Sequence, residues 1–398
     1  MPGDTVPDGT IAIRHLAMSG HSLEDHFFAP GPKRILALDG GGVRGVISLA
    51  YLERLETLLR GRLGPDLVLA DYFDLIGGTS TGAIIAAGLA LGAPVAKLID
   101  TYLTLATKGF RPTIWHAYWA PKFRSAPLLA QIHAQIGETT LGSPAVRTGL
   151  AIVAKRIDTG SVWVFHNHPR GPYFDPANRH AGAVPNKDLL LAQLLRASTA
   201  APTFFAPQRI EVARGVTGVF VDGSVSPHNN PALLMFLLAT LRGYGFRWPV
   251  GAERLMLISV GTGHRPMTPD LMPSLSAPAA MLAVSALSSV IDDCSWLGQA
   301  VLQFLGTSPA PWVIDSEIGD LSEDHLGPQP ALHYQRYSLE LSSPWLRREL
   351  SQTVTPRDLA ELVRIDRPEA VPRLLALARL AARRQVRAEH FPSLFDRI

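Results

Sequence analysis

A glycine–serine–glycine turn between two apolar segments constrains this sequence more than any other feature. Tyr72 to Ile76 is a short apolar run typical of a buried strand, and Ala83 to Leu91 is rich in Ala, Ile and Leu, as expected for a packed helix. Between them lies Gly78-x-Ser80-x-Gly82, the pattern of a nucleophile elbow, in which a serine is held on a sharp strand-to-helix turn. Glycine is expected on both sides of Ser80, because such a turn leaves no room for a Cβ atom. We therefore interpret Ser80 as a catalytic nucleophile rather than as part of an ordinary polar loop.

The composition is that of a globular chain with a large core. Of 398 residues, 47% are hydrophobic and 18% are charged. With 37 basic and 34 acidic residues, the net charge of +3 is too balanced to indicate a nucleic-acid partner. A single cysteine, Cys294, leaves no intrachain disulfide and no cysteine-rich metal site, which fits a reducing compartment. The N-terminus has no signal-peptide pattern, and prolines and serines interrupt the uncharged window from Leu271 to Ile291. We expect a cytoplasmic protein, with peripheral attachment to a membrane as the alternative.

Short apolar strands alternate with helices along the chain. Lys33 to Leu38 is a predicted strand, followed by a glycine loop and a helix from about Val46 to Leu63. Asn230 and Pro231 are predicted to open another helix, as its N-cap and first residue. The further strands predicted are 148–154, 162–165, 218–221, 255–260 and 334–341; the further helices are 189–197 and 232–241, with one or two in 274–305. Solid apolar strands alternating with helices predict an α/β fold with a mostly parallel sheet.

The glycine loop after the first strand has a second interpretation. Gly40-x-Gly42-x-x-Gly45 matches the fingerprint of dinucleotide-binding folds and lies between a strand and a helix. The acidic residue that this fingerprint needs on a second strand is missing, because that zone still belongs to the first helix. Asp39 would also face a pyrophosphate unfavourably, and the Gly-Lys-Ser/Thr of a P-loop is absent. A nucleotide-binding protein that uses the loop Gly40 to Gly45 is therefore the weaker alternative.

Three polar loops each follow a predicted strand: Asp39 to Gly45, Gly78 to Gly82, and Asp222 to Ser224. In an open parallel sheet, such loops gather at one edge, where ligands bind. Ester hydrolysis needs a nucleophile, a base, and N–H donors for the oxyanion. Ser80 supplies the first, Asp222 is a candidate for the second, and the glycines of the first loop are candidates for the third. Since an ordinary aspartate is a poor base, we expect burial to raise the pKa of Asp222.

Other chemistry-bearing residues have ordinary explanations. Phe110 to Arg124 interleaves aromatics with cations, which suits either a membrane–water interface or, more often, a loop pinned by buried aromatics. His166 and His168 have metal-ligand spacing without a carboxylate partner, so we interpret them as strand-end histidines. The arginine-rich C-terminal helix around 371–387 fits a solvated face over a core stripe better than a membrane-bound helix.

Taken in order, Asp39-Gly40-Gly41-Gly42-Val43-Arg44-Gly45, Gly78-Thr79-Ser80-Thr81-Gly82 and Asp222-Gly223 resemble the motifs of the patatin-like phospholipase family. Ala200-Ala201-Pro202 and the Asn-Pro helix start add to the resemblance, which covers roughly Arg34 to Gly263. The family usually has Gly or Ala after Asp-Gly. Here Ser224 takes that place, and its hydroxyl is positioned in the sequence to hydrogen-bond Asp222 and alter its basicity.

The resemblance implies a bacterial stand-alone member with a three-layer α/β/α core and a C-terminal helical extension. It implies a lipid acyl hydrolase of the phospholipase A or lysophospholipase type, which works through an acyl-enzyme without a cofactor, a metal or a catalytic histidine. Ser80 would be the nucleophile, Asp222 its base, and Gly40, Gly41 and Gly42 the oxyanion hole, with Arg44 anchoring or polarising that loop. The substrate implied is a phospholipid or other acyl ester at a membrane surface. His228, six residues after Asp222, is the candidate for a conventional triad, but we expect it in the turn before Asn230.

The resemblance also suggests an alternative with the same chemistry. Some bacterial patatin-like enzymes are effectors of antiviral defence that degrade membranes once a cyclic nucleotide activates them. For the domains, we expect an irregular arm over 1–32 and a catalytic core over 33–265. The remaining 266–398 should be mostly helical and packed on the core, with a late strand near 334–341.

Overall fold

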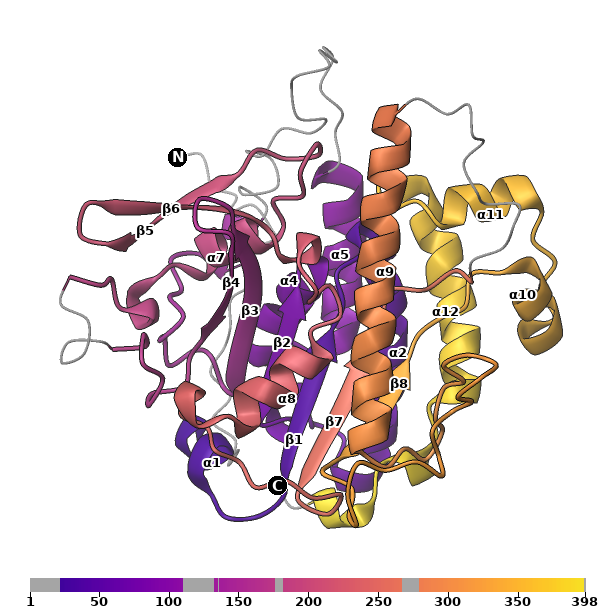
Figure 1. Ribbon diagram of the computed structural model, residues 1–398, viewed down its shortest axis with the longest axis horizontal. Coiled ribbons are helices and arrows are strands. Elements are labelled where there is room, and N and C mark those ends of the chain that lie inside the picture. Colours follow the sequence, from indigo (N-terminus) through magenta and orange to yellow (C-terminus); the bar gives the residue numbers. More distant parts are fainter. Residues whose placement is uncertain (1–21, 110–131, 135, 176–181, 267–278, 397–398) are drawn as a thin grey trace, which may run out of the picture.

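The computed structural model describes residues 22–109, 132–134, 136–175, 182–266 and 279–396. These residues form an eight-stranded sheet in the order β5-β6-β3-β2-β1-β7-β8, with β4 paired to β3 outside this path. Figure 1 shows the strands side by side, with α8 and α9 in front of the sheet and the β5–β6 hairpin projecting from one end. The strands are β1 (Lys33–Leu38), β2 (Leu75–Thr79), β3 (Gly149–Arg156), β4 (Ser161–His166), β5 (Gln208–Ala213), β6 (Val216–Asp222), β7 (Leu255–Val260) and β8 (His333–Tyr337).

The centre of the sheet is parallel, as the apolar strands predict. β1 pairs with β2 on one side and β7 on the other, and β2–β3 and β7–β8 are also parallel. The antiparallel pairs are β3–β4, β3–β6 and β5–β6. Because parallel strands end at the same edge, the loops after β1, β2 and β7 lie together. Asp222 is the last residue of β6, which runs antiparallel to β3. It pairs with Ala154 near the end of β3 and therefore lies at the same edge.

Both faces of the sheet are buried, which explains why its strands are apolar throughout. Along β1, Leu36 and Leu38 pack into one core, whereas Ile35 and Ala37 pack into the other. The first core contains residues of α2, α4, α7 and α12, and the second contains residues of α1, α8 and α9. The fold is therefore a three-layer α/β/α arrangement with additional C-terminal helices, as predicted (Figure 1). The helices are α1 (Leu23–Phe28), α2 (Gly45–Leu63), α3 (Leu69–Tyr72), α4 (Thr81–Ala90), α5 (Val95–Gly109), α7 (Leu191–Ser198), α8 (Ala232–Thr240), α9 (Ala279–Leu305), α10 (Ser343–Leu350), α11 (Pro356–Leu362) and α12 (Val371–Gln385).

Several boundaries differ from those predicted, each for a local reason. The strand before Ser80 begins at Leu75 rather than at Tyr72, because Asp71 accepts a hydrogen bond from the Val68 N–H and stabilises the short helix α3. The strand β5, which the sequence analysis did not predict, has few buried residues and so lacks an apolar run. At the start of α8, the Asn230 side chain accepts a hydrogen bond from the Ala232 N–H, although the N-cap residue of the helix is Pro231.

The aromatic segment 110–124 lies outside the described residues.

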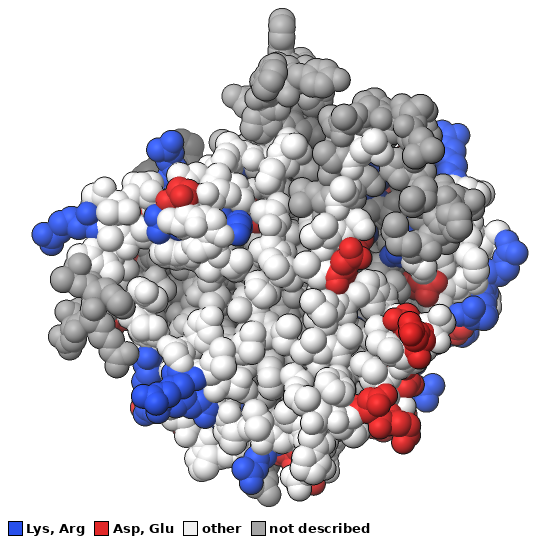
Figure 2. All heavy atoms as spheres, in the orientation of Figure 1, with Lys and Arg blue, Asp and Glu red and all other residues white. Residues whose placement is uncertain are grey.

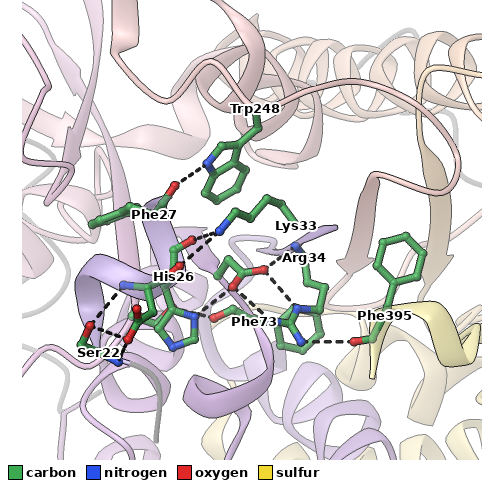
Figure 3. A network of polar contacts seen from close by, with 11 residues as sticks. Ser22, His26, Phe27, Lys33, Arg34, Phe73, Trp248 and Phe395 are labelled. Atoms are coloured by element: carbon green, nitrogen blue, oxygen red, sulfur yellow. Dashed lines mark hydrogen bonds and ion pairs between the residues drawn. The ribbon is translucent and has the colours of Figure 1, made fainter. Parts of the chain in front are cut away.

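The N-terminal end of the sheet is joined by a buried polar network, shown in Figure 3. Asp74, directly before β2, accepts hydrogen bonds from the Arg34 backbone N–H at 2.8 Å and its Nε at 3.0 Å. The second carboxylate oxygen of Asp74 lies 3.0 Å from His26 Nδ1 on α1. Arg34 Nη1 also donates to the carbonyl of Phe395 near the C-terminal end. Part of the region expected to be an irregular arm is thus a helix, which a Ser22–Asp25 capping box begins.

The C-terminal helices pack on the N-terminal half of the chain. The apolar stripe of α12, which includes Leu374, Ala378 and Ala382, belongs to the same core as α2. Arg379 on α12 donates two hydrogen bonds of 2.7 Å to Glu53 on α2. Within the described residues, no helix combines the length and the hydrophobicity needed to cross a bilayer.

Candidate active site

Ser80 occupies a strained turn at the junction of β2 and α4. Thr79 ends the strand, Thr81 begins the helix, and Ser80 between them has φ 54° and ψ −125°. A Cβ on Gly78 would lie 2.3 Å from the backbone of Gly82, and a Cβ on Gly82 would lie 2.4 Å from the carbonyl oxygen of Leu38. Both positions therefore require glycine, and the turn has the geometry of a nucleophile elbow.

Asp222 lies beside this serine. Ser80 Oγ donates a hydrogen bond of 2.6 Å to Asp222 Oδ2, and the two residues are only 7% and 2% exposed. The other carboxylate oxygen accepts from the Ser224 backbone N–H at 2.8 Å. Ser198 holds the backbone of the elbow, because its Oγ accepts from the Ser80 N–H at 2.8 Å. The strand β6 thus presents a carboxylate to the serine at the end where β2 stops.

Burial raises the pKa of Asp222 to about 6. Hydrogen bonds from Ser80 and from both the backbone and the side chain of Ser224 oppose this rise, as does the charge of Arg196. The expectation that burial raises this pKa is confirmed, and the Ser224 hydroxyl moderates the shift. A carboxylate with such a pKa is ionised near neutral pH yet basic enough to take part in proton transfer.

The glycine loop faces the same serine. A Cβ on Gly40 would come within 3.1 Å of the Ser80 Cβ, so the loop backbone passes directly by Ser80. The Gly40 N–H donates to the Asn229 carbonyl at 3.1 Å and is not available to an oxyanion. Within the described part of the chain, the N–H groups of Gly41 and Gly42 have no hydrogen-bond acceptor. Gly42 has φ +56° and abuts the Ile365 carbonyl, so only glycine fits there.

Arg44 and Asp39 flank this loop with buried charge. Arg44 Nε is buried and has no hydrogen-bond partner in the parts of the chain that the structure describes. Burial lowers the pKa of Arg44, while the charges of Asp292 and Asp39 raise it. Asp39 is held instead by Arg336 of β8, whose Nη1 and Nη2 donate to its two oxygens at 2.8 and 2.5 Å. No motif marks Arg336, and it lies far from the glycine loop in the sequence, so its pairing with Asp39 could not be predicted.

His228 lies in the turn before Asn230, as expected. Its backbone N–H donates to Ser226 Oγ at 3.3 Å, and its carbonyl accepts from Thr79 Oγ1 at 2.6 Å. Among the described residues, its imidazole makes no hydrogen bond to Ser80 or Asp222. The polar contact of Ser80 is thus a serine–carboxylate pair rather than a triad.

A cavity of about 490 Å³ opens on the pair. Its walls come from segments far apart in the sequence: the glycine loop, the elbow, the Phe204–Phe205 region, α9, and residues 363–366 after α11. Ile84, Phe204, Phe205, Val363 and Ile365 make much of the lining apolar. The volume lies within the range of small-molecule sites in proteins. The helices expected in 274–305 have a predicted role as a lid or as packing elements, whereas the sequence did not predict the contribution of residues 363–366.

The two strand-end histidines lie away from this cavity. His168 packs its ring on Phe27 and Phe246, with centroids 4.6 and 4.1 Å apart, and His166 packs near Phe246. Within the described ranges, no cluster of three or more His, Cys, Asp or Glu could hold a metal ion. These histidines therefore pack among aromatic side chains next to the end of β4.

The comparisons with known proteins agree with the motifs. The family model for patatin-like phospholipases matches residues 36–236, half of the chain. A cGAMP-activated phospholipase of Escherichia coli (strain TW11681) is 32% identical over 236 residues, covering 58% of this chain and 62% of that protein. Patatin-like protein 1 of Arabidopsis thaliana is 31% identical over 255 residues, covering 58% of each protein. Among solved structures, human GIVD cytosolic phospholipase A2 is similar over 92% of this chain and 61% of its own, with a TM-score of 0.40 and 12% identity.

The three motif loops, the fold that gathers them and the family match lead to one conclusion. The chain belongs to the patatin-like phospholipase family. Its alignments span about three fifths of the length of the curated relatives named above.

Proposed function

We propose that the protein is a lipid acyl hydrolase that uses Ser80 and Asp222 as a catalytic dyad. The observation that carries the proposal is the 2.6 Å hydrogen bond from Ser80 Oγ to Asp222 inside an apolar cavity. Ser80 Oγ attacks the ester carbonyl carbon as its proton passes to Asp222. The tetrahedral intermediate then collapses, and the leaving alcohol takes the proton from Asp222. An acyl-enzyme remains on Ser80.

Water completes the cycle. Asp222 accepts a proton from a water molecule as its oxygen attacks the acyl carbonyl, and the second tetrahedral intermediate expels Ser80 Oγ. The serine regains its proton from Asp222, and the carboxylic acid leaves. Since one carboxylate serves both halves of the reaction, its raised pKa favours proton donation as well as acceptance.

The backbone of the glycine loop suits the oxyanion of both intermediates. Gly41 and Gly42 supply the unengaged N–H groups, while the N–H of Gly40 is already bonded to Asn229. Tyr102 supports the loop from behind, because its hydroxyl donates to the Gly42 carbonyl. Preorganised N–H donors of this kind are typically worth about 2.7–4 kcal/mol each to the transition state.

A membrane surface is the proposed source of the substrate. The helix α9 lines the cavity with Ile291 and exposes Leu282, Val290 and Leu297 on another side, at 39%, 55% and 64%. Figure 2 shows few charged side chains over α8, whereas an acidic patch lies over the middle of α9. We expect this apolar side of α9 to contact lipid, so Val290→Asp should weaken binding to liposomes without slowing hydrolysis of a short, soluble ester. Equal slowing with both substrates would contradict this role.

Covalent labelling tests the nucleophile directly. A lipid-like fluorophosphonate should modify Ser80 and no other serine, as peptide mass spectrometry would detect. Ser80→Ala should abolish labelling, whereas His228→Ala should leave it intact because its imidazole does not contact the pair. Labelling at another serine, or labelling of the Ser80→Ala variant, would exclude the proposed nucleophile.

A second candidate function has one specific observation in its favour. The relative from Escherichia coli (strain TW11681) is named as a cGAMP-activated phospholipase. The same hydrolytic site would then belong to an effector that a cyclic nucleotide activates. Hydrolysis of phospholipid vesicles that appears only after a cyclic dinucleotide is added would favour the effector. Full activity of the purified protein alone would favour an unregulated hydrolase.

A further inference from the structure

A long groove lies on the C-terminal part of the chain, away from the serine. It consists of two adjoining hollows of about 520 and 420 Å³ that share Arg384, Gln385 and Arg387 at the end of α12. Trp345 of α10 lines the first hollow, and Trp312, from the segment after α9, lines the second. Figure 1 shows α10 and α12 together beyond the β8 edge of the sheet. Each hollow therefore has an indole and shares a cationic boundary with the other.

The arginines of α12 outside the groove are tightly paired. Arg379 donates two 2.7 Å hydrogen bonds to Glu53, and Arg373 lies 3.1 Å from Asp358. These residues hold α12 against its neighbours. Their guanidinium groups have carboxylate partners at ordinary hydrogen-bonding distance.

The arginines in the groove are paired loosely. Arg384 is 4.0 Å from Glu349, and Arg387 is 3.6 Å from Glu389; both arginine side chains are more than half exposed. Glu349 is shared with Arg348, which approaches it to 2.7 Å. Both glutamates line the groove, so its positive charge is reduced but not cancelled.

One more arginine borders the first hollow. Arg383 has no ion pair or hydrogen bond with any residue that the structure describes. A helix C-terminus favours cations in general, which explains some positive charge at this point. That effect does not explain why two indoles and a hollow of small-molecule size accompany the cations.

We propose that this groove binds a nucleotide. Guanidinium groups with spare donors match the oxygens of a phosphate, often with two parallel hydrogen bonds. Indole faces stack on nucleobases, a contact typically worth about 1–3 kcal/mol per base. Gln385 adds a donor, because its Oε1 accepts from the Tyr51 hydroxyl at 2.7 Å and its amide nitrogen is left to bind a ligand. Two hollows of this size accommodate a base on each side of a shared phosphate site.

The groove is connected to the hydrolytic site through β8. Trp312 Nε1 donates to the carbonyl of Arg336 at 3.2 Å, and the guanidinium of Arg336 holds both oxygens of Asp39. Asp39 is followed directly by the glycines that face Ser80. A nucleotide stacked on Trp312 thus touches the residue that positions Arg336. Nucleotide binding to the groove does not depend on the proposed hydrolase function. Only an effect of that binding on hydrolysis rests on the proposed function.

Calorimetry on the full-length protein tests the binding. AMP, ATP, a cyclic dinucleotide and inorganic pyrophosphate are titrated in turn at low and high salt. At least one nucleotide should bind, more tightly than pyrophosphate and more weakly at high salt. Arg384→Ala/Arg387→Ala should weaken that binding about tenfold or more, as expected for the loss of charge-assisted hydrogen bonds. Trp345→Leu should weaken nucleotide binding but leave pyrophosphate binding unchanged.

Two controls separate this inference from the proposed function. Arg373→Ala, on the same helix outside the groove, should bind the nucleotide as the wild type does. Ser80→Ala should also bind normally, so binding is decided even if the protein hydrolyses no ester. Failure of every nucleotide to bind at millimolar concentration, equal binding by the double variant, or binding of pyrophosphate as tight as that of nucleotides would each overturn the proposal. Displacement of the nucleotide by vesicles of anionic lipid would overturn it as well, in favour of a membrane-facing groove.

Discussion

Replacing Arg336 by methionine should destabilise the protein and slow the proposed hydrolysis. Arg336 and Asp39 are only 8% and 4% exposed, and their ion pair joins β8 to the first residue of the glycine loop. Methionine keeps most of the length of the arginine side chain but cannot donate a hydrogen bond. The Asp39 carboxylate would then be buried without its partner. The loop that presents Gly41 and Gly42 would lose its fixed starting point.

The size of the loss follows from this burial. Removing one partner of a buried ion pair typically costs about 3–5 kcal/mol, because a charge is left uncompensated. Burial already raises the pKa of Asp39, and the charge and hydrogen bonds of Arg336 oppose that rise. Without Arg336, the pKa of Asp39 should rise further above its unfolded value. The folded variant then binds a proton at Asp39 more readily than the unfolded chain, so the contribution of Asp39 to stability is greatest at low pH and is lost as pH increases.

Urea unfolding at pH 5 and pH 8 measures the effect. Arg336→Met should lose about 3–5 kcal/mol at pH 8 and clearly less at pH 5. Adding Asp39→Asn removes the uncompensated charge and should restore about half of the loss or more. Arg379→Met provides the matched control, since that partly exposed pair with Glu53 should contribute about 1 kcal/mol or less. A pH-independent loss, or no recovery in the double variant, would refute the role assigned to this ion pair.

Three further predictions follow from the site and its surroundings. Since burial raises the pKa of Asp222 to about 6, kcat/KM for a soluble ester should rise with pH through this value and level off above it. Gly41→Ala, whose Cβ would lie 2.2 Å from Thr262 Oγ1, should lower kcat about 100-fold or more with little change in KM. Burial lowers the pKa of His166 to about 3 and that of His168 to about 4, so the free energy of unfolding should decrease as pH falls below 6.5. His168→Phe should flatten that decrease in urea titrations; an unchanged slope would show that His168 does not contribute.

The sequence predicted the parts of the fold that depend on local pattern. β1, β7 and α2 lie within a residue of the predicted ranges, because solid apolar runs mark buried strands and leucines at helical spacing mark the helix. The elbow was recognisable because its two glycines are required sterically on either side of one serine. The loop after β6 was recognisable only together with the other two loops, since Asp-Gly alone is a common turn.

The remaining features depend on contacts distant in the sequence. Arg336 reaches Asp39 only because β8 pairs with β7, and nothing near Arg336 in the sequence reveals that neighbour. The bond from the Gly40 N–H to Asn229, which leaves Gly41 and Gly42 as the candidate oxyanion donors, is likewise a tertiary contact. Helix α1 could have been predicted, because Ser22 and Asp25 form a capping box with the spacing that begins a helix.

The central claim is that a carboxylate, without a histidine, activates Ser80. Steady-state hydrolysis of a phospholipid by Asp222→Asn tests it most directly, with His228→Ala and the wild type measured beside it. The asparagine can still occupy the 2.6 Å contact with Ser80 Oγ, but it cannot accept the proton. We predict that Asp222→Asn loses nearly all activity while remaining folded, and that His228→Ala retains activity close to the wild type. An active Asp222→Asn variant, or an inactive but folded His228→Ala variant, would contradict the dyad.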